Sequence, residues 1–282
     1  MTPLRQAMIT AMQMQGFSPR THESYLAAVT DLARYTHRAP DTLDNRDVAA
    51  YVQYLVTERG LSPSSVRLYF NGIRFLYVEV LHWPASQLQV TLPQRSQKIP
   101  ELLTLEEVGR ILDACTHEHH RMMLALCYGC GLRLNELRHL RVRDIDGDQR
   151  RLRIERGKGD QDRLVNLSST LVKQLRAYWR AYRPEHWLFP GRTPGQPISE
   201  STIQKAFQKA KRRAGISKRG CVHALRHAFT THQLESGLPV HRLQRLLGHK
   251  SLSSTVRYVH WLPDPDEGEG EHDLVGRLPK QK

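Results

Sequence analysis

Helical spacing of apolar residues runs through most of the chain and, more than any other feature, limits the folds it can adopt. Two breaks in this spacing share one pattern, Gly-x-Ser-Pro, from Gly16 to Pro19 and from Gly60 to Pro63. In each, the glycine can end one helix, the serine can cap the next, and the proline suits its first turn. Apolar residues continue at helical spacing as far as Val80. We therefore predict a four-helix bundle over residues 1–83.

The helical pattern lapses over residues 84–100. Pro84, Pro93 and Pro100 bracket a polar run there, as expected of an extended interdomain linker. A capping box, Thr104-x-x-Glu107, then predicts the first helix of a second domain, which we place at residues 101–262.

Within the second domain, one segment departs from helical spacing. Apolar residues alternate on both sides of a turn from Gly157 to Asp160, which predicts a β-hairpin with Lys158 at its tip. Helical spacing returns after Asn166. The fold class is therefore mainly α with a small antiparallel β-sheet. Residues 263–282 are rich in Gly, Glu and Asp, and we expect a flexible acidic tail.

The net charge of the chain indicates what kind of partner it binds. The chain has 42 Lys and Arg against 28 Asp and Glu, a net charge of +14, which is typical of nucleic-acid binding. No apolar run is long enough to span a membrane and the first residues do not resemble a signal peptide, so we expect a cytoplasmic protein without a membrane partner. Its four unevenly spaced cysteines favour reduced thiols over a disulfide framework.

Three short segments carry groups suited to phosphate chemistry. Arg133 and Glu136 lie three residues apart and can share one helical face, as can His223 and Arg226. His249 follows a helix-ending Gly248, and Tyr258 comes nine residues later. Each segment alone has an ordinary explanation, because a lone tyrosine on an amphipathic helix more often packs in a core than reacts.

Taken in order, the segments resemble the tyrosine recombinase family, which includes phage integrases and Xer-type resolvases. The family pattern has an arginine in a Gly-Leu-Arg-x-x-Glu-Leu segment, a hairpin lysine, His-x-x-Arg, a histidine after Leu-Gly, and a tyrosine shortly downstream. The matching residues are Arg133, Lys158, His223, Arg226, His249 and Tyr258, with Glu136 at the supporting acidic position. The front bundle resembles the family's core-binding (SAM-like) domain, followed by an α+β tyrosine recombinase catalytic domain.

The chemistry explains these residue types. Attack on a phosphodiester adds negative charge, which the fixed guanidinium groups of Arg133 and Arg226 can stabilise. The Tyr258 hydroxyl needs a proton acceptor, for which we choose His223. The resemblance assigns protonation of the leaving 5′ oxygen to Lys158, and His249 would donate to a phosphate oxygen. It implies a 3′-phosphotyrosyl intermediate without metal or cofactor.

The resemblance also implies double-stranded DNA recombination sites as partner, bound by a homotetramer on synapsed DNA. The protein would then be nucleoid-associated when bound to DNA. Two departures stand out. Many relatives have a second basic residue at the position of Gln161, and many have an apolar docking helix after the nucleophile, where Pro263, Pro265 and an acidic run occur here. Integrase, transposon recombinase and resolvase stay open, as does the target sequence.

Other functions fit parts of the pattern. A type IB topoisomerase would use the same side chains, although the small helical front domain favours a recombinase. A non-cleaving DNA-binding accessory protein could keep the fold, but would not need all six catalytic positions. Cys127-x-x-Cys130, with nearby histidines, has zinc-ligand spacing, yet both cysteines fall on an apolar helix where small thiols pack well.

Overall fold

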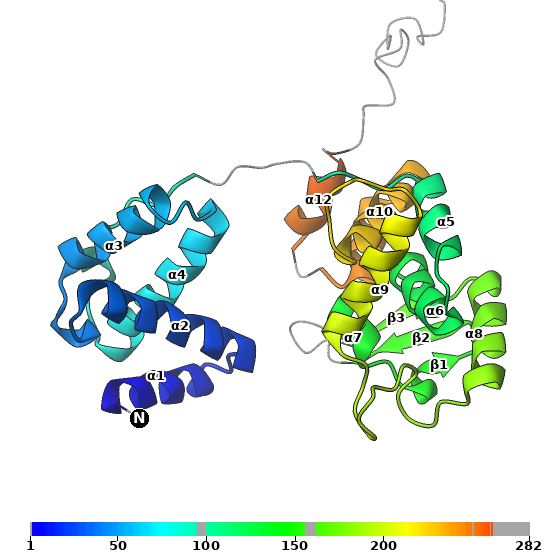
Figure 1. The fold of residues 1–282 in the computed structure, drawn as a ribbon, viewed down its shortest axis with the longest axis horizontal. Helices are drawn as coiled ribbons and strands as arrows, with labels where there is room; N and C mark the ends of the chain where they lie inside the picture. Colours follow the sequence, from blue (N-terminus) through cyan, green and yellow to red (C-terminus); the bar gives the residue numbers. More distant parts are fainter. Residues whose placement is uncertain (1, 95–99, 156–161, 250, 260, 262–282) are drawn as a thin grey trace, which may run out of the picture. The chain divides into compact units, whose positions relative to one another are not determined.

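The computed structural model describes residues 2–94, 100–155, 162–249, 251–259 and 261. It forms two compact units, Met1–Lys98 and Ile99–Lys282 (Figure 1). The predicted tip of the hairpin, with Lys158 and Gln161, and the predicted acidic tail at 263–282 lie outside the described residues. Within the described ranges, no helix combines the length and apolar character needed to cross a bilayer.

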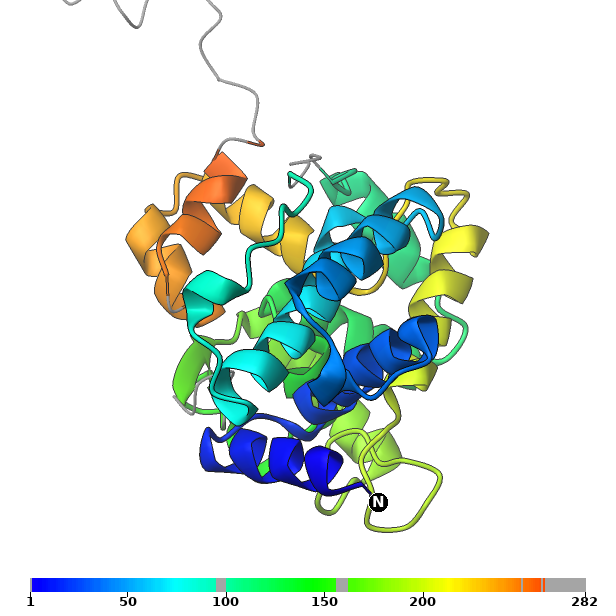
Figure 2. The same cartoon turned by 90° about the vertical axis from the view of Figure 1, so that its left-hand side faces the viewer.

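The first unit contains the four predicted helices, drawn from blue to cyan (Figures 1 and 2). They are α1 (Pro3–Met14), α2 (Pro19–Thr36), α3 (Asn45–Thr57) and α4 (Pro63–Phe75), the last continued by a π-helical turn, Leu76–Val80. The predicted caps are confirmed: Ser18 accepts from the Thr21 amide and Ser62 from the Ser65 amide. The helices pack closely, since a Cβ added to Gly72 of α4 would lie 3.0 Å from Cα of Tyr25 in α2.

Part of the predicted linker, residues 84–100, packs against the first unit. A 3-10 turn (Ala85–Gln87) leads into Leu88, which is buried against the first unit together with the partly buried Val90 and Leu92. The carbonyl of Pro93 accepts a hydrogen bond of 3.1 Å from Arg67. The physical reason is apolar burial: these three side chains alternate along the segment and all find a place on the bundle.

The second unit combines helices with one three-stranded antiparallel sheet. The helices are α5 (Leu105–Asp113), α6 (Glu118–Gly129), α7 (Leu134–Arg138), α8 (Ser169–Tyr182), α9 (Glu200–Arg213), α10 (His223–Glu235), α11 (Val240–Leu247) and α12 (Ser253–Val259), with a 3-10 turn at Val142–Asp144. The sheet order is β1 (Ile145–Asp146), β2 (Arg151–Ile154), β3 (Arg163–Asn166). The predicted fold class, mainly α with a small antiparallel sheet, is confirmed.

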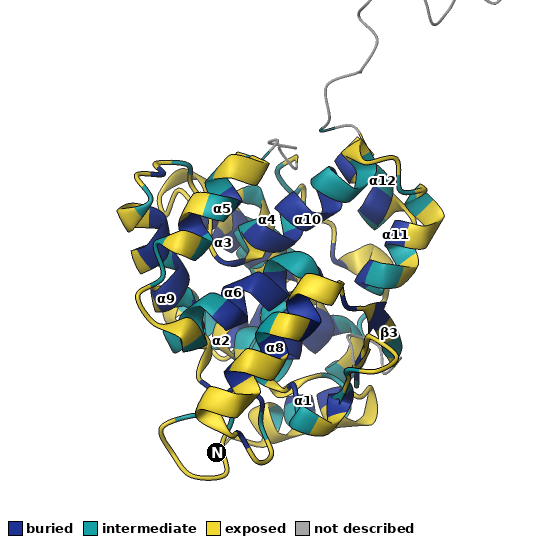
Figure 3. Ribbon diagram, turned by 90° about the vertical axis from the view of Figure 1, so that its right-hand side faces the viewer, coloured by how far each residue is buried: buried dark blue, intermediate teal, exposed yellow. Residues whose placement is uncertain are grey.

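Helix α6 forms the centre of this unit's core. Its six consecutive residues from Met122 to Cys127 are buried and give it a dark blue stretch in Figure 3, whereas α8 turns an exposed face outward. The capping box at Thr104 and Glu107 opens α5 as predicted, with both of its hydrogen bonds formed. Helix α10 packs against α6, and α11 and α12 pack against α10. The three segments that carry the motifs are thereby held on one core.

Candidate active site

Glu136 lies at the centre of a cluster of polar side chains, called the polar cluster below, in which it faces Arg133, Arg163 and Arg226. Its side chain is only 5% exposed, and both carboxylate oxygens accept from Arg163 of β3 at 2.7 Å, a bidentate pair. Arg133 donates to it as well, from the side chain at 2.7 Å and from the backbone amide at 2.8 Å. Burial alone would raise the pKa of Glu136, but these hydrogen bonds and the charge of Arg163 lower that pKa to about 2.

Arg163 begins β3, in the segment predicted as a β-hairpin, and is not one of the candidate site residues named from the sequence. Its contacts give it a larger part, because its Nε also donates to the carbonyl of Leu246 at the end of α11, at 2.8 Å. It therefore ties the sheet to the helix that precedes His249. Arg133 similarly donates to the carbonyl of Gly248, at 3.0 Å. With 24% of its side chain exposed, against 9% for Arg163, Arg133 is the more accessible cation.

Arg226 is almost completely buried, with 1% of its surface exposed. It extends from α10 and donates to the carbonyl of Gly131 and, at 2.7 Å, to that of Leu247. Burial, and next the positive charge of Arg133, lower the pKa of Arg226 to about 9, so the guanidinium stays charged at pH 7. The backbone around it is closely fitted: Gly131 has φ of 59°, and a Cβ there would lie 2.5 Å from Phe229.

His249 uses both ring nitrogens inside the cluster. Its Nε2 lies 3.0 Å from Nη2 of Arg226, and its Nδ1 lies 2.9 Å from the hydroxyl of Thr255 in α12. Burial, followed by the charges of Arg226 and Arg133, lowers the pKa of His249 to about 4, which makes the ring neutral near pH 7. Because a guanidinium can only donate, Nε2 accepts and Nδ1 carries the proton. Donation from His249 to a phosphate therefore requires one of these contacts to be exchanged.

Tyr258 lies on α12 with 6% of its surface exposed. Its hydroxyl is 2.8 Å from Nδ1 of His227, a residue outside the predicted set, and its ring packs edge-on against Trp261 at 4.7 Å between centroids. Burial raises the pKa of Tyr258, while Arg226 and Arg257 oppose this rise. The hydroxyl is thus buried beside an imidazole and within the electrostatic reach of the cations.

His223 lies one helical turn before His227, and the two rings meet edge to face with centroids 4.7 Å apart. Burial, then the charges of Arg226 and Arg133, lower the pKa of His223. Five residues of the predicted set thus come together with Glu136 around α10 and the start of α7. They are Arg133, His223, Arg226, His249 and Tyr258. Lys158 lies outside the described residues.

The cysteine pair that suggested zinc packs in the core. Cys127 and Cys130 are 2% and 0% exposed, and burial raises the pKa of Cys130 to about 12. Within the part of the chain that the structure describes, no three metal-binding side chains gather in one place. Both cysteines pack among the apolar side chains of the core, as small thiol side chains commonly do.

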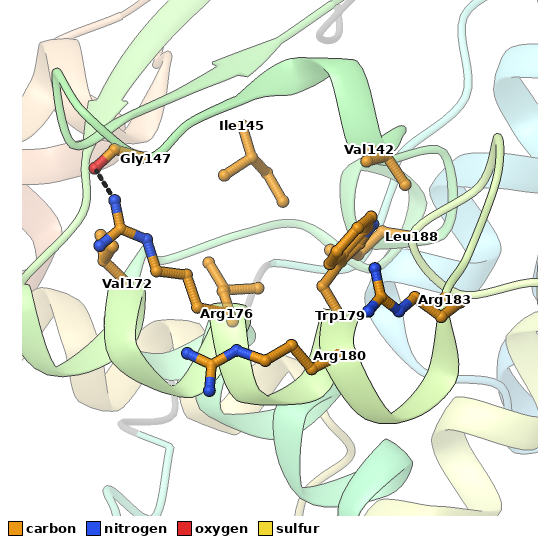
Figure 4. A pocket seen from close by; sticks show the side chains of 10 residues that line it. Val142, Ile145, Gly147, Val172, Arg176, Trp179, Arg180, Arg183 and Leu188 are labelled. Carbon is orange, nitrogen blue, oxygen red and sulfur yellow. Dashed lines mark hydrogen bonds between the residues drawn. The ribbon is translucent and has the colours of Figure 1, made fainter.

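A pocket of about 590 Å³ opens elsewhere on the second unit, beside α8 (Figure 4). Its walls include apolar side chains such as Ile145 and Leu175, and Arg183 stacks over the ring of Trp179 at 4.1 Å. Arg176 reaches across to the carbonyl of Gly147. None of the candidate catalytic residues that the structure describes lines this pocket. It is a feature separate from the polar cluster.

Comparisons with known proteins identify the family of this chain. The model of the phage integrase family matches residues 101–264, and that of the phage integrase N-terminal SAM-like domain matches residues 4–86. This chain belongs to the phage integrase family, a class of DNA strand-exchange enzymes known as tyrosine recombinases. The resemblance inferred from six motif positions is confirmed at the level of the family.

Two relatives illustrate the similarity. "Putative integrase/recombinase y4qK" of Sinorhizobium fredii (strain NBRC 101917 / NGR234) is 41% identical over 92% of this chain and 84% of its own length. Tyrosine recombinase XerD of Listeria innocua serovar 6a (strain ATCC BAA-680 / CLIP 11262) is 29% identical over 84% of each chain.

Solved structures show the same architecture. The XerA recombinase is 26% identical and superposes with a TM-score of 0.55, covering 93% of this chain and 94% of the other. The Tn1549 transposon integrase in complex with transposon right end DNA gives a TM-score of 0.72 at 16% identity, over 91% and 94% of the two chains. The latter similarity supports the fold alone.

Proposed function

We propose that this protein cuts and rejoins duplex DNA at specific recombination sites, with Tyr258 as the nucleophile. The observation that supports it most is the place of the Tyr258 hydroxyl, 2.8 Å from an imidazole and within reach of the charge of Arg226. Attack would form a bond between the phenolic oxygen and phosphorus and break the bond from phosphorus to the 5′ oxygen. The product is a 3′-phosphotyrosyl link and a free 5′ hydroxyl.

Arg133 and Arg226 are proposed to hold the non-bridging phosphate oxygens. Both guanidinium groups are fixed before DNA arrives, through Glu136 and through backbone carbonyls. Fixed donors stabilise the charge of the transition state without the cost of reorganising solvent. Lys158 would protonate the leaving 5′ oxygen, and His249 and His223 would complete the set of six. Because the phosphotyrosyl link conserves the bond energy, a 5′ hydroxyl from another strand can reverse the attack.

The proposed partner is double-stranded DNA carrying recombination sites, bound by four copies of this chain. The net charge of +14 favours phosphate-rich partners, and the Tn1549 integrase and the XerH recombinase have been solved with their DNA substrates. Strand exchange needs one nucleophile for each of four strands, which is the reason for proposing a homotetramer. We place the protein in the cytoplasm, on the nucleoid when bound.

The test is a covalent trap. Nicked duplexes made from the DNA that flanks the gene would be incubated with the protein and resolved on a denaturing gel. The wild type and Tyr182→Phe, a control at an exposed tyrosine of the same unit, should form a protein–DNA adduct. Tyr258→Phe should form none while its DNA binding stays nearly unchanged. An adduct retained by Tyr258→Phe would contradict the assignment of the nucleophile.

The same duplexes separate two alternatives. A type IB topoisomerase would relax supercoiled plasmid as a monomer and would not exchange strands between two duplexes. A non-cleaving DNA-binding protein would bind without any adduct. Exchange of strands between two labelled duplexes is therefore the result that distinguishes recombination from both.

A further inference from the structure

The Tyr258 hydroxyl is hydrogen-bonded to a histidine outside the six residues predicted from the sequence. His227 follows Arg226 directly in α10, and its Nδ1 lies 2.8 Å from Oη of Tyr258. The two rings are tilted by 41° with centroids 5.5 Å apart, so the contact is made by the nitrogen and the hydroxyl rather than by stacked faces. A proton acceptor must lie within about 2.6–3.2 Å of the oxygen that it deprotonates. His227 meets this condition in the DNA-free protein.

From this geometry we infer that His227 accepts the phenolic proton when Tyr258 attacks DNA. The inference deepens the proposed function and rests on it. His227 takes the part that the sequence suggested for His223, which lies one turn earlier and has its ring against that of His227. His223 then faces the phosphate together with Arg226, from which it is three residues distant on the same helix.

The surroundings of His227 keep it ready to accept a proton. Burial first, and then the charges of His223, Arg226 and Arg257, lower the pKa of His227 to about 4. The ring is therefore neutral near pH 7, and a neutral imidazole whose Nδ1 faces a hydroxyl can act as the acceptor. His223 and Arg226 belong to its own helix, and Arg257 belongs to α12, the helix that carries Tyr258.

The charges of Arg226 and Arg257 oppose proton transfer to His227 until DNA is bound. An imidazolium beside Arg226 is unfavourable in the free protein, because like charges repel. A DNA phosphate placed between Arg133 and Arg226 adds negative charge at that point and makes His227 a stronger base. The proton acceptor thus gains strength when the substrate is in place.

The proposed step is balanced. The phenolic proton moves from Oη of Tyr258 to Nδ1 of His227 while the bond between that oxygen and phosphorus forms. The bond to the 5′ oxygen breaks, and the proton that this oxygen gains comes from Lys158. During rejoining, the imidazolium of His227 returns its proton to the phenolate of Tyr258.

Asparagine variants separate holding the hydroxyl from accepting its proton. In His227→Asn the amide oxygen can occupy the place of Nδ1 and keep a hydrogen bond, but it cannot take up the proton. Single-turnover cleavage of a nicked gene-flanking duplex should slow by roughly 10²–10⁴-fold, the usual contribution of general base catalysis. DNA binding should stay unchanged. His241→Asn, at an exposed position of α11, should cleave like the wild type.

Replacing Tyr258 by 3,5-difluorotyrosine supplies the decisive readout. Fluorine lowers the phenolic pKa, so attack by the phenolic oxygen depends less on a base that removes its proton. In the His227→Asn background the fluorinated protein should recover to within about tenfold of the fluorinated wild type. In a His223→Asn background it should not. A purely structural defect at His227 would not respond to the acidity of the phenol.

Three results would overturn the inference. Cleavage by His227→Asn at the wild-type rate would show that no proton is accepted there. Loss of cleavage without recovery by difluorotyrosine would reduce His227 to a packing role. Recovery of His223→Asn alone would return the base to His223. Failure of the proposed function is recognised separately, because the wild type would then form no covalent adduct with the duplex, and both proposals would fall.

Discussion

Replacing Glu136 by glutamine should destabilise the second unit by about 3 kcal/mol at pH 7. The pKa of Glu136 falls from an ordinary value of 4.5 to about 2, and each factor of ten in proton affinity corresponds to about 1.4 kcal/mol. The charged carboxylate therefore contributes roughly 3 kcal/mol. Independently, removing one member of a buried ion pair costs about 3–5 kcal/mol, because the other charge is left buried. Arg163, with 9% of its side chain exposed, is that remaining charge.

The pH dependence follows from the lowered pKa of Glu136. Its stabilisation is fully present above about pH 4.5, where the carboxylate is ionised in both folded and unfolded chains. It is lost as the pH falls from there towards 2, since protonation then favours the unfolded chain. The difference between wild type and Glu136→Gln should thus be constant near neutrality and shrink in acid.

Urea unfolding followed by tryptophan fluorescence can measure this difference. Carrying both proteins in a Trp83→Phe background removes the tryptophan of the first unit and leaves Trp179, Trp187 and Trp261 to report on the second. Asp148→Asn is the matched control. Asp148 pairs with Arg176, and its own side chain is 97% exposed, so its loss should change stability too little to resolve. A loss below about 1 kcal/mol at pH 7, or a difference unchanged by acid, would refute the account of Glu136.

Two further predictions concern the backbone at the site and the DNA contact. In thermal melts, Gly131→Ala should cost about 2 kcal/mol, and it should also slow cleavage, because its Cβ would meet Phe229 at 2.5 Å and its carbonyl binds Arg226. Gly109→Ala in α5, with open space around it, should be neutral or stabilising in thermal melts run alongside. DNA affinity measured by fluorescence anisotropy should fall by on the order of 10³ or more between about 50 and 200 mM salt if six or more phosphates are contacted, whereas a flat response would contradict binding through phosphates.

The helices and their joints were predictable because their causes are local. A serine cap followed by proline, or a threonine with glutamate three residues later, fixes a helix start within a few residues, and Ser18, Ser62 and Thr104 are caps in the structure. Strand β1, with two residues, was not predicted, because a segment so short has no periodicity of its own. The packing of Leu88, Val90 and Leu92 left an alternating pattern that the surrounding prolines obscured.

The family pattern located the residues of the cluster but not all of their contacts. Arg163 and Glu136 are 27 positions apart, and only the folded sheet shows that they form a bidentate pair. His227 did leave a signal, since it follows His223 by four positions and both therefore share one face of α10. It was missed because the motif was taken to end at Arg226. The position of Lys158 stays a prediction.

The contacts of Arg226 set an order in which this activity could be lost during evolution. Its guanidinium holds the carbonyls of Gly131 and Leu247, which are separated by more than a hundred residues and flank Arg133 and His249. A mutation there would remove a cross-link of the fold along with a catalytic charge. Tyr258 instead lies on the short helix α12, near the end of the described chain. We therefore expect descendants that bind DNA without cutting it to lose Tyr258 first. They should keep Arg226 for its structural contacts, even after it no longer binds the phosphate that is attacked.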